Sequence, residues 1–483
     1  MIVGLDIGTQ SLKAVVCDDR LAVLGSGAVG YAPEYPAPGR AEQDPGLWER
    51  ALGPAIAAAL DAAGVAPGAV AALGVTGQLD GCIAVGADGR ALAPALIWMD
   101  RRATAEIAGI PAETVRQRAG AVLDATHMAA KIRWLARHGP GAARYHQPVS
   151  YLVLRLTGEH RLDHGLASTT MLYGLAERDW DDALLALFDL DRAVLPPLAE
   201  AFAPAGPLSP AGAALSGLPA GIPVAVGTGD DFANPLGAGL VAPGCVAMAV
   251  GTAEVVGALD PRPLIDAAAL VETHAYAGPL YFIENPGWLA GGAVRWFVAA
   301  HRLDGPAAMD GLAAEVPAGA EGVLFLPALS GAMAPRWVAS ARAAYYGLSA
   351  AHGAGHMARA VLEGCAFAAR DVVERLREMG VAVAGAVMLG GGARSRLWAR
   401  IRADILDLPV TVPHHIDTAP IGAAMLAAVA GRVLPSLEEA AALVGGGGRT
   451  LTPDGGARGL YDDAYGRYRC LFDSLKPMYE NKE

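Results

Sequence analysis

The first residues of the chain follow a pattern that predicts a buried strand, a tight turn and a second strand. Residues 2–7 are almost wholly apolar, a Gly-Thr pair stands at 8–9, and residues 12–16 are again mostly apolar. A glycine beside a small polar residue is a common turn signal between two apolar runs. The opening of the chain therefore predicts a strand–turn–strand hairpin.

The same plan returns about half a chain later. Residues 246–250 are apolar, a second Gly-Thr pair follows at 251–252, and two valines stand at 255–256. Repetition over so long a distance indicates a duplicated domain, because a solenoid would repeat within about 20–50 residues. We place the boundary before the second hairpin and expect domains 1–242 and 243–483.

Segments with apolar residues at helical spacing alternate with short apolar runs in both halves. Strands that alternate with helices are typical of layered α/β folds, so we expect that class here. The predicted helices cover 46–63, 356–379 and 397–406, and the predicted strands cover 71–75, 95–98 and 387–389.

Composition narrows the class of protein. A chain of 483 residues exceeds what one hydrophobic core usually supports, and its net charge of −12 argues against nucleic acid as a partner. Five scattered cysteines without a C-x-x-C pair fit a reducing compartment. With neither a secretory signal nor an apolar run fit to cross a membrane, we expect a cytoplasmic protein without a membrane partner.

The first hairpin carries groups that could hold a nucleotide. Asp6 ends the first strand, where its carboxylate could hold Mg²⁺ through waters or simply cap the turn. Thr9, Gln10 and Ser11 could donate to phosphate oxygens. Lys13 could do so too, although it alternates with apolar neighbours like a solvent-facing strand residue.

Two later glycine loops have the same character. Gly251 and Thr252 could grip phosphates from the second domain, or form an ordinary hairpin turn. The run 390–392 lies between a strand and a helix, where its amides could face a nucleotide. It lacks the G-x-G-x-x-G spacing, and the chain has no G-x-x-x-x-G-K-[ST] loop, which excludes the P-loop class.

A pair of acidic residues supplies a candidate base. Asp230 and Asp231 stand in a glycine-flanked turn between two apolar runs. A carboxylate there could accept the proton of a hydroxyl that attacks the γ-phosphate of a nucleotide. Paired acidic residues in a loop are more often merely solvated.

Further motifs lie between and after these loops, all in a characteristic order. They are D-x-G-T-x-S at 6–11, E-Q-D-P at 42–45, G-Q-x-D-G at 77–81, P-A-L-I-W-x-D at 94–100, K-x-x-W at 131–134, G-x-G-D-D at 227–231 and F-L-P-x-L-S-G at 325–331. In this arrangement the chain resembles the FGGY carbohydrate kinases, and within them it is most similar to xylulokinases.

The resemblance implies an actin/hexokinase-like fold, in which two ribonuclease-H-like domains close a cleft on ATP, Mg²⁺ and a sugar. It implies that Asp230 is the general base and that Asp6 helps to hold the metal. It places Gly8, Thr9, Gln10, Ser11, Lys13, Gly251 and Thr252 at the phosphates, Gly391, Gly392 and Ser395 at the nucleoside, and Gln78, Leu79, Asp80, Asp100 and Asp231 at the sugar.

The implied activity is transfer of the γ-phosphate to a terminal hydroxyl of a ketopentose, with D-xylulose giving D-xylulose 5-phosphate. Asp80 stands where xylulokinases usually have His, and Asp231 where they usually have Asn. Ionised carboxylates only accept hydrogen bonds, so this pocket would favour substrates that offer hydroxyl donors.

These departures are also compatible with a different substrate, which could be another ketose, a deoxy-ketose or a polyol such as erythritol. A non-catalytic actin-like ATPase or sugar sensor is a more distant alternative, and a homodimer is also open. Glu254, where a small residue is usual, and residues 126–128 depart from the family pattern as well.

Overall fold

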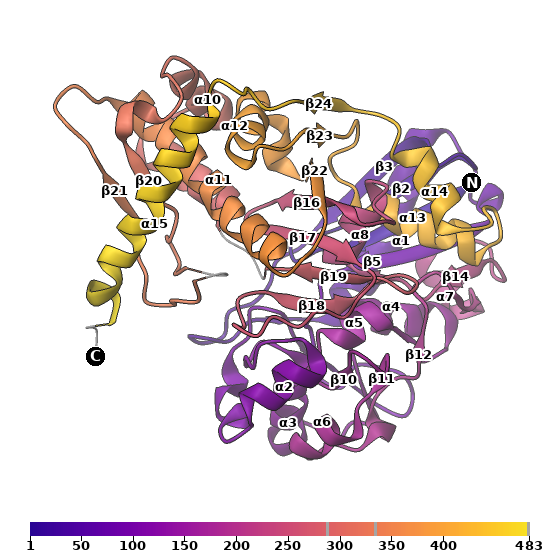
Figure 1. Ribbon diagram of the computed structural model, residues 1–483. Helices are drawn as coiled ribbons and strands as arrows, with labels where there is room; N and C mark the ends of the chain where they lie inside the picture. The colour runs from indigo at the N-terminus through magenta and orange to yellow at the C-terminus, as the bar shows by residue number, and fades with distance from the viewer. Residues whose placement is uncertain (286–288, 333–335, 481–483) are drawn as a thin grey trace.

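Two mixed sheets built on one plan form the centre of the protein (Figure 1). The structure is a computed structural model that describes residues 1–285, 289–332 and 336–480. In spatial order, the first sheet contains β13 (Pro204–Pro207), β14 (Pro223–Ala225), β5 (Ala72–Gly77), β1 (Ile2–Ile7), β2 (Ser11–Cys17) and β3 (Val23–Gly30), with β15 (Thr228–Gly229) also paired to β5. The second contains β18 (Glu272–Ala275), β19 (Tyr281–Glu284), β17 (Glu254–Asp260), β16 (Gly244–Val250), β22 (Val383–Leu389), β23 (Val410–Val412) and β24 (Arg449–Leu451).

The pairing of the strands shows the duplication that the hairpins predicted. β1 and β2 form an antiparallel hairpin with β5 parallel beside β1, and β16 and β17 form the matching hairpin with β22 parallel beside β16. The α/β class with two ribonuclease-H-like sheets is therefore confirmed. The predicted division between 242 and 243 falls just before β16 and stays a prediction.

Strand register brings three distant segments to one edge of the first sheet. Ile7 pairs with Gly77 of the parallel neighbour β5, and Gly229 of β15 pairs with the same Gly77. Parallel strands end together, so the residues that follow them lie side by side. Gln78 and Asp230 therefore leave the sheet next to the first Gly-Thr turn.

The helices pack against the sheets. Those predicted from apolar residues at helical spacing lie where the sequence predicts them. The three predicted helices correspond to α1, α11 and α12, each within two residues at either end. The helices are α1 (Pro45–Ala63), α2 (Ala112–Ala119), α3 (Met128–His138), α4 (Pro148–Thr157), α5 (His164–Ser168), α6 (Asp182–Leu187), α7 (Pro210–Ser216), α8 (Asp230–Gly237), α9 (Ala290–Ala300), α10 (Pro306–Ala314), α11 (Ala354–Glu378), α12 (Arg396–Leu406), α13 (Ala419–Ala430), α14 (Leu437–Val444) and α15 (Arg458–Glu480).

Short ribbons complete the described chain. The strand predicted at 95–98 is only two residues long, because the chain turns at Ile97 with a hydrogen bond from the Asp100 N–H to its carbonyl. The ribbons pair β4 (Glu42–Gln43) with β7 (Ala95–Leu96), β6 (Ile83–Val85) with β8 (Arg144–His146), β9 (Leu162–Asp163) with β12 (Leu198–Ala199), β10 (Tyr173–Gly174) with β11 (Asp179–Trp180), and β20 (Leu324–Leu326) with β21 (Ala344–Tyr346).

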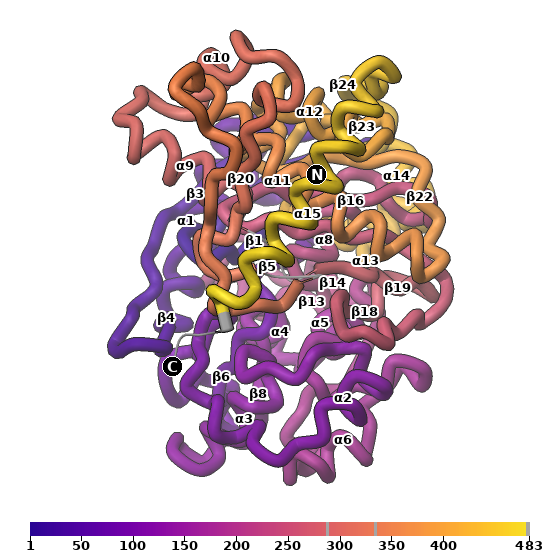
Figure 2. The backbone as a smooth tube through the Cα atoms, turned by 60° about the vertical axis from the view of Figure 1, so that its left-hand side comes forward, coloured from indigo at the N-terminus to yellow at the C-terminus, as the bar shows by residue number. Residues whose placement is uncertain are grey.

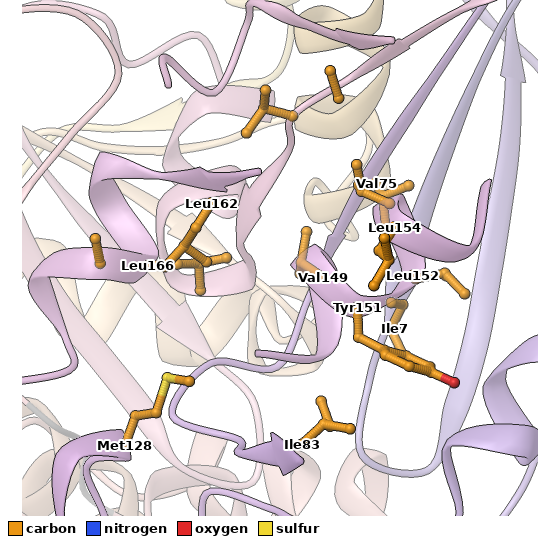
Figure 3. Packing of buried hydrophobic residues seen from close by; sticks show 14 of the residues in the cluster. Ile7, Val75, Ile83, Met128, Val149, Tyr151, Leu152, Leu154, Leu162 and Leu166 are labelled. Atoms are coloured by element: carbon orange, nitrogen blue, oxygen red, sulfur yellow. The ribbon is translucent and has the colours of Figure 1, made fainter. Parts of the chain in front are cut away.

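Three hydrophobic clusters fill the part of the protein that the structure describes. One occupies the first half, where Ile7, Val75 and Val149 belong to the group drawn in Figure 3, and a second occupies the other half. The third joins the two sheets, since it contains Ile2 of β1, Val387 of β22 and much of α13. Burial of this shared cluster holds the halves together.

Helix α13 belongs to the second half of the sequence but packs on β1, β5 and α8 of the first. Its backbone comes so close that a Cβ on Gly4 would clash with the carbonyl oxygen of Pro420, and one on Gly74 with that of Ala423. Only glycine, without a side chain, permits this approach. The first sheet is therefore fastened directly to the C-terminal half.

Helices α2, α3 and α6 lie apart from the C-terminal helix. In both views, α2, α3 and α6 form a group at the bottom of the molecule, whereas α15 runs along the second half above them (Figures 1 and 2). No described helix combines the length and the apolar character that a membrane-spanning segment requires.

Replacing Gly4 with Ala should destabilise the protein, because the new methyl group meets the backbone of α13 rather than a movable side chain. We expect a loss of about 3 kcal/mol or more, seen by calorimetry as a melting midpoint lowered by roughly 5 °C or more. Gly68→Ala is the matched control, since nothing lies within 4 Å of its new Cβ. Equal melting of the two variants would contradict the close packing of α13.

Candidate active site

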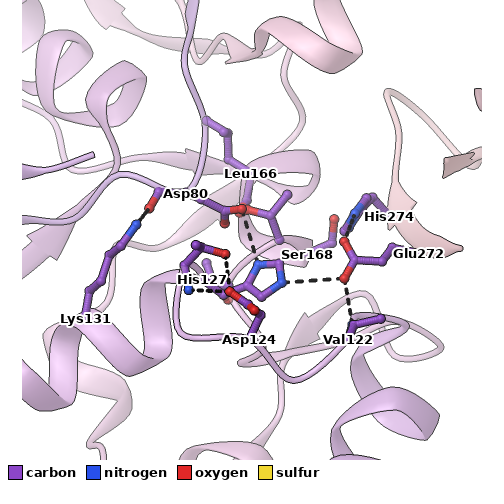
Figure 4. Close-up of polar contacts among 12 residues, drawn as sticks. Asp80, Val122, Asp124, His127, Lys131, Leu166, Ser168, Glu272 and His274 are labelled. Carbon is purple, nitrogen blue, oxygen red and sulfur yellow. Dashed lines mark hydrogen bonds and ion pairs between the residues drawn. The ribbon is translucent and has the colours of Figure 1, made fainter. Parts of the chain in front are cut away.

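Asp80 follows the end of β5 and is held in a strained conformation. Its φ of +56° lies in the left-handed region, which costs energy for a residue other than glycine. The Asp80 N–H donates to Gln147 Oε1 (2.9 Å), and its carbonyl accepts from Lys131 Nζ (2.6 Å). Asp80 Oδ2 lies 3.3 Å from His127 Nδ1, and Oδ1 is buried with no hydrogen-bond partner among the described residues (Figure 4). A strained residue with one free acceptor is typical of a binding site.

Gln78 and Leu79 link this loop to its neighbours. Gln78 Nε2 donates to Gln43 Oε1 (2.8 Å), and Gln43 Nε2 donates to the carbonyl of Thr9 (2.7 Å). Gln78 Oε1 is buried and has no partner within the described ranges. Leu79 packs against Gly229, immediately before Asp230. The sugar loop predicted from the motif is therefore linked to the first hairpin through Gln43 and contacts Gly229, the residue before the acidic pair.

Asp230 and Asp231 form the first turn of α8, so the loop expected from the sequence is instead the start of a helix. Acidic residues stabilise a helix N-terminus, where unpaired N–H groups point outward. Burial and the neighbouring Asp231 raise the pKa of Asp230 to about 7, and burial and Asp80 raise that of Asp231 to about 7. Both carboxylates are partly buried, not freely solvated.

Asp6 and Lys13, both on the first hairpin, lie near the Asp230 carboxylate. Burial and Asp230 raise the pKa of Asp6 to about 7, against the opposing effect of Lys13. Lys13 Nζ lies 3.9 Å from Asp6 Oδ2 and donates to Asp417 Oδ2 (2.8 Å). The lysine is thus engaged with carboxylates of both halves and is not a plain solvent-facing strand residue.

The Asp6 carboxylate fits a metal ion held mainly by phosphates. The described residues contain no group of three or more His, Cys, Asp or Glu side chains that could form an all-protein metal site. Asp6 Oδ1, however, is buried and lacks a partner within the same ranges. Mg²⁺ in nucleotide sites usually takes only one or two carboxylates, with waters and phosphates as its other ligands.

The two predicted phosphate hairpins have different neighbours. Thr9 Oγ1 accepts from Trp98 Nε1 (3.0 Å), while Gln10 is exposed and Ser11 begins β2. Thr252 Oγ1 accepts from Arg295 Nη2 (2.7 Å), and its carbonyl accepts the N–H of Gly292 (2.9 Å). Arg295 of α9 therefore brings a cation to the second hairpin, which no sequence motif had indicated.

The third glycine loop lies at the end of β22. A Cβ on Gly392 would come 2.5 Å from Val250 Cγ1, whereas one on Gly391 would meet nothing within 4 Å. Gly392 thus packs against Val250 of β16, and Gly391 faces open space. Ser395 Oγ accepts the N–H of Trp398 (2.9 Å) and caps α12. The roles of these residues toward a nucleoside stay predictions.

Asp100 supports the loop structure around it. Its carboxylate is fully buried, accepts the N–H of Ala41 (2.7 Å) and pairs with Arg102 (2.7 Å). Arg102 also pairs with Glu42 (2.6 Å). A sugar hydroxyl would have to share these occupied oxygens, so the assignment of Asp100 to the sugar stays a prediction.

Glu254, which departs from the family pattern, has a buried partner. Arg402 of α12 is fully buried and binds both carboxylate oxygens of Glu254, with Nη2 2.8 Å from Oε2. The guanidinium also lies over the ring of Trp398. The unusual glutamate therefore ties the end of the second hairpin to α12.

Two ribonuclease-H-like sheets, each with a Gly-Thr hairpin, define an actin/hexokinase-like fold, and acidic side chains gather at the strand ends of the first sheet. The comparisons extend this assignment. The model of the N-terminal domain of the FGGY family of carbohydrate kinases matches residues 1–237, and that of the C-terminal domain matches residues 246–431.

Known relatives cover nearly the whole chain. A glycerol kinase of Aromatoleum aromaticum is 34% identical over 461 residues, which are 91% of this chain and 92% of that protein. The xylulose kinase of Escherichia coli is 32% identical over 447 residues, with coverage of 91% and 92%. The structure of xylulose kinase from Rhodospirillum rubrum has a TM-score of 0.89 at 30% identity and covers 99% of this chain and 100% of that one. The chain belongs to the FGGY family of carbohydrate kinases and is a phosphotransferase with an alcohol group as acceptor.

Breaking the Glu254–Arg402 pair should destabilise the second half. Glu254→Gln leaves the buried guanidinium without its counter-charge, so we expect a loss of about 3–5 kcal/mol of unfolding free energy. The double variant Glu254→Leu/Arg402→Met should recover most of that loss, because no buried charge is left unpaired. Calorimetric melting checks both variants. A single variant as stable as the wild type would refute this role for the pair.

Proposed function

We propose that the protein transfers the γ-phosphoryl group of ATP to a terminal hydroxyl of a small neutral polyhydroxy compound, with D-xylulose, giving D-xylulose 5-phosphate, as the first candidate. The observation that carries the proposal is the meeting of Asp6, Lys13 and Asp230 at the strand ends beside the sugar loop. The xylulose kinase relatives support this choice of acceptor. We further propose that 1–242 and 243–483 act as the two closing domains.

In this proposal Asp230 is the general base. It accepts the proton of the acceptor hydroxyl while the hydroxyl oxygen bonds to the γ-phosphorus, and the bond from that phosphorus to the bridging oxygen breaks to release ADP. A base works best when its pKa lies near the working pH, as that of Asp230 does. Mg²⁺ would be held by Asp6 and would screen the phosphate charge. Closure of the halves would exclude water, which otherwise competes as acceptor.

The other site residues are proposed as the sequence predicts them. We propose that the phosphates contact Gly8, Thr9, Gln10, Ser11, Lys13, Gly251 and Thr252, that the nucleoside contacts Gly391, Gly392 and Ser395, and that the acceptor contacts Gln78, Leu79, Asp80, Asp100 and Asp231.

A polyol such as erythritol is a second candidate, with other ketoses and deoxy-ketoses beside it. Asp80 Oδ1 is a buried acceptor without a partner among the described residues, and Asp231 adds a second carboxylate near it. Such acceptors favour hydroxyl donors over the carbonyl of a ketose, and they repel anionic substrates. The glycerol kinase relatives also favour a polyol.

Replacing Asp230 with Asn should remove the base while it preserves the shape of the side chain. We expect kcat to fall by roughly 10²–10⁴-fold with the KM for ATP close to the wild-type value. Coupled ADP-release assays with the best acceptor measure both constants. Asp19→Asn, at an exposed turn, is the matched control. Near-wild-type kcat in Asp230→Asn would exclude the assigned base.

Replacing Asp80 with His should move the preference toward D-xylulose. An imidazole can donate a hydrogen bond to a ketose carbonyl, which a carboxylate cannot do. We expect the ratio of kcat/KM for D-xylulose to that for erythritol or glycerol to rise by about tenfold. The ADP-release assay over C4–C7 ketoses and polyols, plus glycerol, provides the ratio, with exposed Asp88→His as control. An unchanged ratio would count against specificity set at this position.

A further inference from the structure

A chain of alternating carboxylates and imidazoles crosses from one half of the protein to the other (Figure 4). Asp80 Oδ2 lies 3.3 Å from His127 Nδ1, and His127 Nε2 lies 3.5 Å from Glu272 Oε1. His274 Nε2 in turn lies 3.5 Å from Glu272 Oε2 and 3.6 Å from Glu284 Oε1. All five side chains are buried. The chain begins at the sugar loop and ends in the second sheet.

The residues of this chain that belong to the second sheet lie on one face of it. Glu272 and His274 are two residues apart on β18, and Glu284 on β19 is the direct cross-strand partner of Glu272. Residues with this spacing point to the same side of a sheet. Two glutamates directly opposite each other would repel. His274 Nε2 lies between their carboxylates. Burial and the neighbouring carboxylates raise the pKa of Glu284 well above its usual value, which favours its uncharged form and removes that repulsion.

Strand β18 is docked on the first half by its backbone. The Thr273 N–H donates to the carbonyl of Gly120 (3.0 Å), and the Ala275 N–H donates to Ser168 Oγ (3.0 Å). Glu272 Oε1 also accepts the N–H of Val122 (2.7 Å). The position of Glu272 relative to His127 is therefore set by the contact between the halves.

The charges around His127 favour its protonated form. Burial alone would lower the pKa of His127, but the carboxylates of Asp80 and Glu272 raise it well above the usual value. Burial would raise the pKa of Glu272, yet His127 and His274 hold it far below its usual range. Asp124, before α3, and Lys131, on α3, are the other charged groups near this end of the chain.

We propose that His127 is a positioning and specificity-determining residue: its imidazolium is clamped between Asp80 and Glu272 and fixes the Asp80 carboxylate as an acceptor for a substrate hydroxyl. This inference rests on the proposed function, because it assumes that Asp80 faces the acceptor molecule. His127 does not itself touch the substrate. It balances the charge of Asp80 at Oδ2 and leaves Oδ1 free.

The clamp also gives the two oxygens of Asp80 different roles. Oδ2 faces the His127 ring, whereas Oδ1, without a partner among the described residues, can accept from a substrate hydroxyl. The pocket therefore selects hydroxyl donors. Glu272 holds the imidazole from the second half, and the acceptor is therefore fixed only while β18 is docked.

Kinetics of His127→Gln tests the clamp. We expect the KM for the best acceptor to rise roughly 10- to 100-fold, the loss of one charge-assisted contact, with the KM for ATP nearly unchanged. In an Asp80→Asn background the same change should have little further effect. His138→Gln, an exposed histidine at the other end of α3, is the matched control. Equal effects in both backgrounds, equal changes in both KM values, or no change at all would overturn the proposal.

A titration that needs no activity tests the charge of His127. In protein labelled with ¹⁵N-histidine, the His127 signal is assigned with His127→Gln or, if that variant melts early, His127→Asn. We expect this imidazole to stay protonated to higher pH than the other histidines, and to lose this feature in Asp80→Asn. In the wild type, kcat/KM for the acceptor should fall as pH rises through the same transition, because the protonated form is the competent one.

These measurements distinguish a failure of the His127 clamp from a failure of the proposed function. If both variants fail to fold, the wild-type spectrum decides, and the absence of any imidazole that stays charged after the others would overturn the clamp. An alkaline fall that follows Lys131, whose pKa burial lowers to about 8, would persist in His127→Gln and would also overturn it. If the wild type phosphorylates no acceptor, the proposed function fails, while the titration of His127 still shows whether the clamp exists.

Discussion

The close contact of α13 with β1, β5 and α8 is the constraint on which the rest of the structure depends. Its backbone lies against Gly4 and Gly74 with no room for a side chain. This contact fastens a helix from the second half to the central strands of the first. Because those strands end in register at Ile7 and Gly77, whatever fixes them also fixes the groups that follow. The candidate site is built at the edge that α13 holds in place.

The pKa values of the acidic residues at that edge follow from their burial close to one another. Asp6, Asp230 and Asp231 all have raised pKa values because burial brings carboxylates together with little positive charge between them. Lys13 offsets part of this repulsion on one side, and His127 does so at Asp80 on the other. A site with this surplus of negative charge is suited to a metal-bound nucleotide and to neutral acceptors rich in hydroxyl groups.

Patterns in the sequence predicted the elements that depend mainly on residues close together in the chain. The Gly-Thr hairpins, their duplication and the helix α11 follow from apolar spacing and turn residues. The helical start at Asp230 was not predicted, because only the surrounding structure decides whether acidic residues after a glycine begin a helix. The clamp on His127 and the partner of Glu254 depend on residues far away in the sequence. Only the departures from the family pattern at 126–128 and at Glu254 indicated that something unusual lay there.

Transfer of phosphate to an alcohol and not to water is the reaction that the proposed function requires. Phosphorus-31 NMR of the protein with ATP, Mg²⁺ and the candidate acceptors tests it most directly. We expect the γ-phosphorus signal of ATP to be replaced, in equal amount, by a phosphate monoester signal coupled to the two protons of a terminal CH₂ group. Formation of inorganic phosphate alone, at the same rate with and without an acceptor, would show that the protein is not a kinase of these acceptors.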